Sequence, residues 1–152
     1  MNRVLVLNGP NLASLGHRQT DVYGTTSLGE IETAVRQRAD ELGIEVHFAQ
    51  SNHEGELIDI LEVERDRADG CIVNLGALTH TSLAMADALR IFNGPVVEVH
   101  LSNIHAREPY RRVSLTAEAA TGMIAGLGMH GYVLALEAVA ALLVRQSAES
   151  TP

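Results

Sequence analysis

Short apolar runs alternate along this chain with longer segments in which apolar residues recur three or four positions apart. The short runs are typical of buried strands, and the longer segments are typical of amphipathic helices. This pattern predicts five strands, at residues 3–7, 44–50, 71–75, 95–100 and 122–127.

Helices are predicted in most of the intervals between these strands. The first begins at Ser27, three residues before Glu30 as in a capping box, and ends at Gly43. The others are expected at residues 54–67, 81–92 and 131–144, the first of these with Leu57, Ile58, Leu61 and Val63 as its apolar set. A long polar loop is expected up to about residue 26, and a disordered tail from about residue 146.

Alternating strands and helices with apolar strands predict a single α/β domain spanning residues 1–152. We expect a flavodoxin-like, doubly wound, five-stranded parallel sheet of order 2-1-3-4-5 with helices on both faces. Such sheets bind ligands beyond the carboxyl ends of their strands. The residues that follow strands one, three and four are therefore candidates: Asn8, Asn11, Asn74, Gly76, Ala77, His100 and Ser102.

The charged residues narrow the possible chemistry. The formal net charge is −8, which disfavours nucleic acid and anionic membrane surfaces as partners. All 11 basic residues are arginines, so a Schiff-base lysine, a pyridoxal phosphate linkage and a P-loop lysine are all excluded. No apolar run approaches the roughly 20 residues of a membrane span, and no signal peptide is recognisable. The one cysteine, Cys71, is expected to be a buried apolar side chain in a reducing, cytoplasmic compartment.

Arg18 and Tyr23 lie in the long first loop, which is of the length often found in functional lids. A tyrosine is a poor base at neutral pH unless a nearby positive charge lowers its pKa. The pair could therefore supply a base and its activator. On spacing alone, however, a surface arginine and a packing tyrosine are the more common arrangement.

Glu98 and His100 end the fourth predicted strand and, being two residues apart, point to the same face. The carboxylate could orient the imidazole and make it a suitable general acid. An ordinary half-exposed strand end explains the same two residues about equally well.

Two further segments could bind an anion. Residues 74–81 lead from strand three into a helix, with His80 near its start, and residues 105–112 bring three arginines into one loop. A capping histidine and a solvated basic turn are the alternative interpretations. The histidines show no ligand spacing typical of a metal site, and no cofactor-binding motif follows a strand.

Four ordered blocks of this sequence resemble the type II 3-dehydroquinate dehydratases. The blocks cover residues 7–24, 50–59, 79–82 and 98–107, and the similarity extends over residues 4–143. The resemblance implies a cofactor-free elimination of water from 3-dehydroquinate through an enolate, giving 3-dehydroshikimate in the shikimate pathway. It also implies a dodecamer built from trimers.

The resemblance further implies a role for each matching residue. Tyr23 would be the base, Arg18 its activator, and Asn11 would hold a water at the enolate. His100 would protonate the leaving hydroxyl, with Glu98 orienting it. Substrate binding would fall to Asn74, Gly76, Ala77, His80, Leu101, Ser102 and Arg111, and Asp87 would reach the site of a neighbouring subunit.

The sequence departs from the family pattern at Gln19-Thr20 in the first loop and at Met85-Ala86 before Asp87. Two other interpretations remain open. One is a flavodoxin-like binding or signalling module, although Asn74 stands where a phospho-receiver needs an aspartate, and the aromatic content of 3% leaves little to stack on a flavin. The other is a diverged relative that has lost the activity.

Overall fold

A computed structural model describes residues 1–152 and contains one five-stranded sheet in which every strand pair is parallel. The strand order β2-β1-β3-β4-β5 is the predicted one. Asn8, at the end of β1, is in register with Gln50 on one neighbouring strand and with Asn74 on the other. The strands are β1 (Arg3–Asn8), β2 (Glu45–Gln50), β3 (Gly70–Asn74), β4 (Val96–His100) and β5 (Gly122–Ala125).

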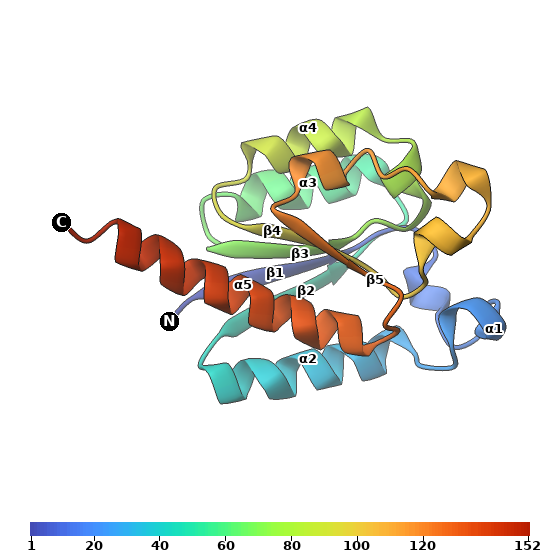
Figure 1. Cartoon of the computed structure of the whole chain (residues 1–152), viewed down its shortest axis with the longest axis horizontal. Coiled ribbons are helices and arrows are strands. Elements are labelled where there is room, and N and C mark those ends of the chain that lie inside the picture. The colour runs from blue at the N-terminus through green and yellow to red at the C-terminus, as the bar shows by residue number, and fades with distance from the viewer.

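Helices cover both faces of the sheet. In Figure 1, α2 (Leu28–Leu42) and α5 (His130–Glu149) lie together on one side, and α3 (Glu54–Glu64) and α4 (Leu83–Ile91) lie on the other. A short helix, α1 (Thr20–Tyr23), stands apart from these layers near the carboxyl ends of the strands. The doubly wound α/β architecture predicted from the sequence is therefore confirmed.

Strand β1 shows how the sequence builds two cores. Val4 and Val6 pack with α2 and α5, whereas Leu5 and Leu7 pack with α3 and α4. All four side chains are buried because successive side chains of a strand point to opposite faces, and both faces are covered. Cys71 is buried in the second core, and that burial raises the pKa of its thiol.

The caps of α2 follow the predicted chemistry. The Ser27 hydroxyl accepts a hydrogen bond from the Glu30 backbone N–H at 3.2 Å, and Gly43 ends the helix with a φ of 67°. Ile31, Val35 and Ala39 recur every fourth residue and turn one face of α2 into the core.

Four details differ from the sequence predictions. Val63 is 53% exposed, and Glu64 takes the buried position because Arg3 pairs with its carboxylate at 3.1 Å. The expected irregular first loop contains α1, and the helix expected from residue 81 is preceded by a 3₁₀ turn at Gly76–His80. Finally, α5 continues through residues 146–149, where we expected a disordered tail.

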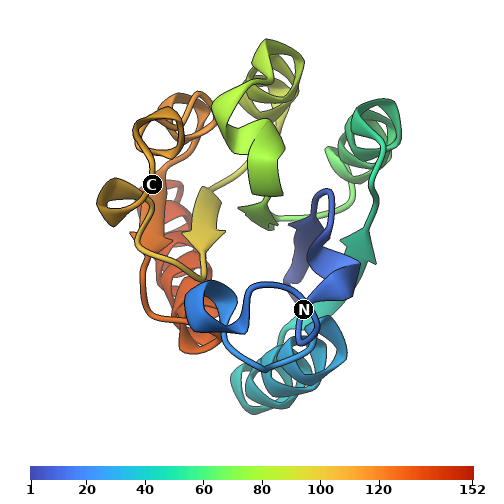
Figure 2. The ribbon, with the colours of Figure 1, turned by 90° about the vertical axis from the view of Figure 1, so that its right-hand side faces the viewer.

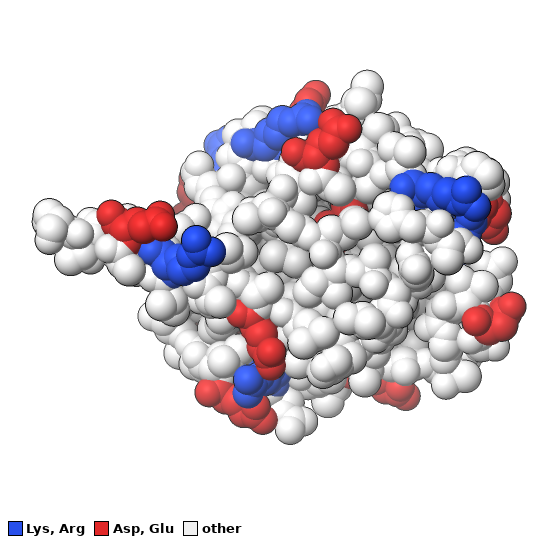
Figure 3. Space-filling model, viewed as in Figure 1, with Lys and Arg blue, Asp and Glu red and all other residues white.

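Helix α5 has 20 residues and a mean hydropathy of 1.3, which by length and composition would suffice to cross a membrane. A helix that packs on a sheet passes the same test, and α5 places Tyr132, Leu136 and Val139 in the first core. In Figure 3, basic and acidic side chains are scattered over the visible face without a broad basic surface.

Candidate active site

A cavity of about 100 Å³ lies beyond the carboxyl ends of β1, β3 and β4. Figure 2 shows this end of the molecule, where the segment that contains α1 and the segment that follows β4 lie around the strand ends. The cavity lies at the switch point of the strand order, where the fold class predicts a ligand site.

The cavity is lined by basic side chains and by no acidic ones. Arg18, Arg107, Arg111, His80 and His100 contribute to the lining, and no aspartate or glutamate does. In a chain of net charge −8, this local excess of positive charge is well suited to a small anion. Guanidinium groups in particular bind carboxylates with two parallel hydrogen bonds.

Tyr23 ends α1 and places its hydroxyl between two guanidinium groups. Arg18 donates a hydrogen bond to the phenolic oxygen at 3.3 Å, and Arg107 donates another at 2.7 Å. Both guanidinium groups also lie over the ring, at 4.4 and 5.1 Å from its centre. The predicted contact between Arg18 and Tyr23 is present.

Arg107 is the cavity residue that sequence reasoning missed. It makes the shorter of the two hydrogen bonds to Tyr23, although 84 positions separate the two residues. The available signals were its place at the end of the block 98–107 and in the run of arginines at residues 105–112, for which a carboxylate clamp and a solvated basic turn were both left open.

Asn11 lies in the turn after β1 and lines the cavity. Its φ of 68° is in the left-handed region, which asparagine adopts more readily than most residues. The side-chain oxygen of Asn52 fixes this turn by accepting a hydrogen bond from the Asn11 backbone N–H at 3.0 Å. The side-chain amide of Asn11 is not used in this contact and can face a ligand.

His100 and Glu98 form the predicted pair at the end of β4. His100 Nε2 lies 2.8 Å from a carboxylate oxygen of Glu98, so Nδ1 is the ring nitrogen left for the cavity. Glu98 is fully buried and does not line the cavity itself. Burial raises the pKa of Glu98, but hydrogen bonds from His100, Thr116 and Ser114 outweigh it and hold that pKa below its usual value. The carboxyl is therefore ionised at neutral pH.

Asn74, at the end of β3, is held by a chain of buried hydrogen bonds. Its amide nitrogen donates to the Tyr132 hydroxyl at 2.9 Å, and that hydroxyl donates to the Asn8 side chain at 2.7 Å. Asn8 in turn donates to the carbonyl of Ala49 at 3.1 Å. This chain fixes the orientation of the Asn74 amide, which lines the cavity.

The turns after β1 and β3 approach each other so closely that glycine is required in both. A Cβ on Gly9 would lie 2.5 Å from the carbonyl oxygen of Leu75, and a Cβ on Gly76 would lie 2.8 Å from that of Pro10. Gly76 also has a φ of 57°, in the left-handed region. The predicted residues Gly76 and Ala77 both line the cavity formed beside this contact.

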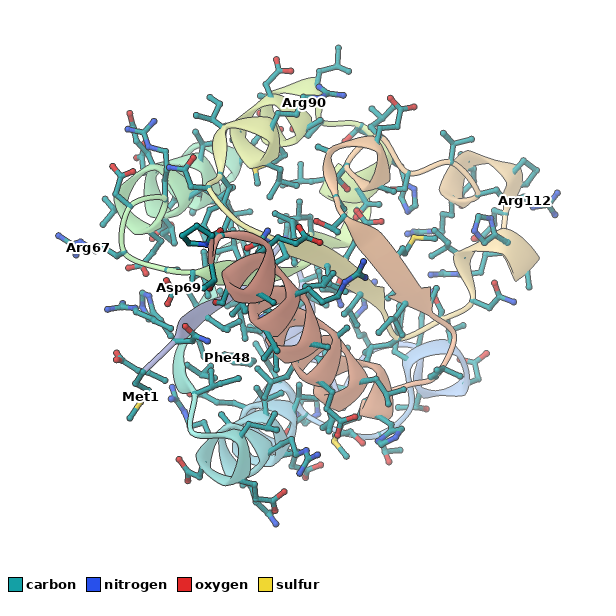
Figure 4. All side chains as sticks on the ribbon, turned by 60° about the vertical axis from the view of Figure 1, so that its left-hand side comes forward. Met1, Phe48, Arg67, Asp69, Arg90 and Arg112 are labelled. Carbon is teal, nitrogen blue, oxygen red and sulfur yellow. The ribbon has the colours of Figure 1, made fainter.

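The remaining predicted binding residues reach the cavity from the loops. His80 Nδ1 donates to the Val113 carbonyl at 2.8 Å, so the neutral ring presents Nε2 as an acceptor. Leu101, Ser102 and Arg111 also line the cavity. Arg112 does not, because its side chain is exposed and points outward (Figure 4). The three arginines of this loop are thus divided between the cavity and solvent.

Three predicted site residues, Asn8, Glu98 and Asp87, do not line the cavity. Asn8 and Glu98 are buried, and Asp87 is the exposed one. It is on α4, its side chain is exposed, and it pairs with Arg90 at 3.1 Å. This exposure leaves the carboxylate accessible to another molecule.

Comparisons with known proteins show which proteins share this arrangement. Residues 2–140 match the model of a family described as "Dehydroquinase class II". The chain is 55% identical over 139 residues to 3-dehydroquinate dehydratase 2 of Corynebacterium efficiens, covering 90% of this chain and 96% of that one. It is 52% identical over 135 residues to the 3-dehydroquinate dehydratase of Roseiflexus castenholzii, covering 89% and 86%.

Two crystal structures of type II dehydroquinases have similar folds. That from Butyrivibrio crossotus superposes with a TM-score of 0.89 at 37% sequence identity, over 91% of this chain and 97% of the other. That from Propionibacterium acnes also gives 0.89, at 39% identity, over 93% and 97%.

Proposed function

Since this chain belongs to the class II dehydroquinase family, we propose that it is a hydro-lyase that converts 3-dehydroquinate to 3-dehydroshikimate in the shikimate pathway. The observation that carries the proposed mechanism is the placement of Tyr23, with its two arginines, and His100, with its buried carboxylate, on the lining of one cationic cavity. A base and an acid in one cavity are what an elimination of water requires.

Tyr23, as its phenolate, takes the proton from the carbon next to the substrate ketone. The guanidinium groups of Arg18 and Arg107 hydrogen-bond the phenolic oxygen and stabilise a negative charge there. The electron pair left on carbon moves to the ketone oxygen and forms an enolate. Asn11 holds a water against this oxygen, which stabilises the charge that develops on it.

His100, protonated on both ring nitrogens, then gives its Nδ1 proton to the leaving hydroxyl. The enolate collapses, the carbon–oxygen bond breaks and water leaves, so that a carbon–carbon double bond conjugated with the ketone remains. Glu98 stabilises the imidazolium form of His100 and orients it. The route uses side chains and one bound water, and it needs no cofactor or metal.

The other cavity residues bind the substrate. Arg111 and the backbone of Leu101 and Ser102 hold the carboxylate and hydroxyls, with Asn74 and His80 as further hydrogen-bonding partners. Gly76 and Ala77 let the ligand approach the backbone closely.

The same proposal extends to assembly and location. We propose that the chain forms a dodecamer built from trimers in the cytoplasm, in which Asp87 reaches the cavity of a neighbouring subunit. Its exposed position on α4, away from the cavity of its own chain, supports such a contact.

The test is the ultraviolet absorbance of purified protein mixed with 3-dehydroquinate and no added metal or cofactor. The conjugated enone of the product should make the absorbance rise. Tyr23→Phe should lower kcat by about 10²–10⁴-fold, the usual contribution of a general base. The matched control is Tyr110→Phe, because Tyr110 is 69% exposed and should tolerate the change.

Full turnover in Tyr23→Phe would refute the role of this residue. No turnover by the folded wild-type protein would instead favour a diverged relative without the activity. A yellow, flavin-containing preparation would support the binding-module interpretation.

A further inference from the structure

A cluster of hydroxyl groups surrounds the carboxylate of Glu98 on the side away from the cavity. Thr116 donates a hydrogen bond to one carboxylate oxygen, and Ser114 donates to the other at 2.8 Å. The second oxygen also receives the Nε2–H of His100 at 2.8 Å. Thr116 is fully buried, and neither hydroxyl lines the cavity, so both can act only through Glu98.

The hydrogen bonds of Ser114 determine which way its proton points. Its hydroxyl oxygen accepts the Ala117 backbone N–H at 2.9 Å, and the hydroxyl carries a single proton. The Glu98 oxygen lies 2.8 Å from the Ser114 oxygen and the Thr116 hydroxyl oxygen lies 3.3 Å from it, so the proton is directed to the nearer acceptor, Glu98. Thr116 directs its own proton to the other oxygen of the same carboxylate.

Two hydroxyl donors select the ionised form of the carboxyl group. A protonated Glu98 would be a donor itself, whereas an ionised one only accepts. As an acceptor it must receive the Nε2 proton of His100, which leaves Nδ1 facing the cavity. The hydroxyl cluster thus determines the tautomer of a histidine that it does not touch.

The loop that carries these hydroxyls is tied to the wall of the cavity. The backbone N–H of Leu115, between the two residues, donates to the carbonyl of Thr79 at 2.9 Å. Thr79 precedes the cavity residue His80, whose ring stacks on that of His100 with the ring centres 6.4 Å apart. The position of the hydroxyls relative to Glu98 is therefore fixed by the same segment that shapes the cavity.

We propose that Thr116 and Ser114 are positioning residues, which hold Glu98 as an acceptor for the Nε2–H of His100. Nδ1 then faces the cavity, and in the imidazolium form of His100 it carries the proton that goes to the leaving hydroxyl. This inference rests on the proposed function. Thr116 matters most, because it is the only donor to its carboxylate oxygen, whereas the other oxygen has two.

The decisive variant is Thr116→Val, which replaces the hydroxyl with a methyl group of similar size. We expect kcat for 3-dehydroquinate to fall about tenfold, by analogy with the lower end of the loss seen when the partner of a metal-ligating histidine is removed, with little change in KM. Thr116→Ser should restore the wild-type kcat because it keeps the hydroxyl. Thr79→Val is the matched control, since Thr79 is equally buried but its hydroxyl has no hydrogen-bonding partner.

A second measurement does not depend on turnover. In ¹⁵N NMR spectra of neutral His100, the wild-type protein should show the Nε2–H tautomer with a proton protected from exchange. Thr116→Val should lose that protection or mix the two tautomers. Ser114→Ala provides a second variant, acting on the other carboxylate oxygen, if Thr116→Val does not fold.

A double-mutant comparison separates positioning from a general loss of stability. In a Glu98→Gln background, Thr116→Val should cause little further loss of kcat, because its route to His100 is already broken. An equal loss in both backgrounds, or a wild-type tautomer in Thr116→Val, would overturn the proposal. If the wild-type protein did not turn over the substrate, the proposed function would fail and the NMR result alone would decide this inference.

Discussion

The phenolic oxygen of Tyr23 is hydrogen-bonded by two guanidinium groups that come from opposite halves of the chain. Arg18 lies five positions away in the sequence, and its contact could be anticipated from spacing. Arg107 lies 84 positions away, yet its hydrogen bond, at 2.7 Å, is the shorter one. The spacing in the sequence therefore predicted only the longer of the two hydrogen bonds, that of Arg18.

Arg107→Met should test whether this second guanidinium supports the base. Removing one hydrogen-bond donor to a negatively charged oxygen in an active site, here the phenolate oxygen of Tyr23, costs about 10²–10³-fold in kcat. Methionine keeps much of the apolar stem and removes the charge. Steady-state kinetics should show the loss, whereas Arg145→Met, at an exposed arginine on α5, should leave kcat nearly unchanged. Wild-type kcat in Arg107→Met would show that Arg18 alone suffices.

At the scale of single elements, the strands were the most predictable part of the molecule. Their apolar runs specify both covered faces of a parallel sheet, and the alternation of Val4 and Val6 with Leu5 and Leu7 follows from the geometry of a strand. The caps of α2 were also predictable, because Ser27 and Gly43 act on backbone groups within their own helix.

Helix α3 shows where local pattern stopped being sufficient. Leu57, Leu61 and Glu64 follow the helical period of a buried face, but the last of them is charged. The sequence prediction counted Val63 among the apolar residues of this helix, but Val63 is exposed and Glu64 is buried. The partner of Glu64, Arg3 on β1, is brought close only by the tertiary fold, so no local reading of α3 could have included it.

The turn after β3 allows a test at this scale. Gly76→Ala places a Cβ in contact with the Pro10 carbonyl and forces a side chain into the left-handed region. We expect the free energy of unfolding to fall by about 1–3 kcal/mol, as for other strained backbones, with a loss of activity because Gly76 and Pro10 both line the cavity. Urea denaturation monitored by circular dichroism and steady-state kinetics would measure the two effects.

The control for this variant is Gly55→Ala in α3. Apart from its chain neighbours and the backbone of its own helix, no atom lies within 4 Å of a Cβ at that position, and alanine favours the helix. The variant should keep its activity and gain up to about 1 kcal/mol in stability. Equal stability of Gly76→Ala and the wild-type protein would mean that the two turns can move apart without cost.

At the scale of the whole molecule, the cavity depends on a helix that does not line it. Tyr132 on α5 packs on the same face of the sheet as Val6 and reaches the ends of β1 and β3, where its hydroxyl joins the side chains of Asn8 and Asn74. The run of apolar residues in the sequence predicted that Asn74 lies at the end of a strand. The local pattern did not indicate that Tyr132, 58 positions later, would orient the side-chain amide of Asn74.

Tyr132→Phe tests what the hydrogen bonds of Tyr132 to Asn8 and Asn74 contribute to stability and to substrate binding. Burial raises the pKa of the Tyr132 hydroxyl, so it remains a neutral donor and acceptor at physiological pH. Without it, Asn8 loses the hydroxyl donor to its side-chain oxygen and Asn74 loses its acceptor, both at buried positions, which should cost about 1–3 kcal/mol of stability. Tyr110→Phe, at an exposed tyrosine, should change stability by less than about 0.5 kcal/mol.

The same variant should also raise KM, because the Asn74 amide at the cavity wall would be oriented only by the Gly76 backbone N–H, which donates to its oxygen at 3.3 Å. The base and the acid are untouched, so kcat at saturating substrate should fall much less than kcat/KM. A loss of stability with an unchanged KM would show that these hydrogen bonds support the fold alone. A raised KM would show that α5 extends its influence from the core to the substrate, through a hydrogen-bond chain that begins at a fully buried residue.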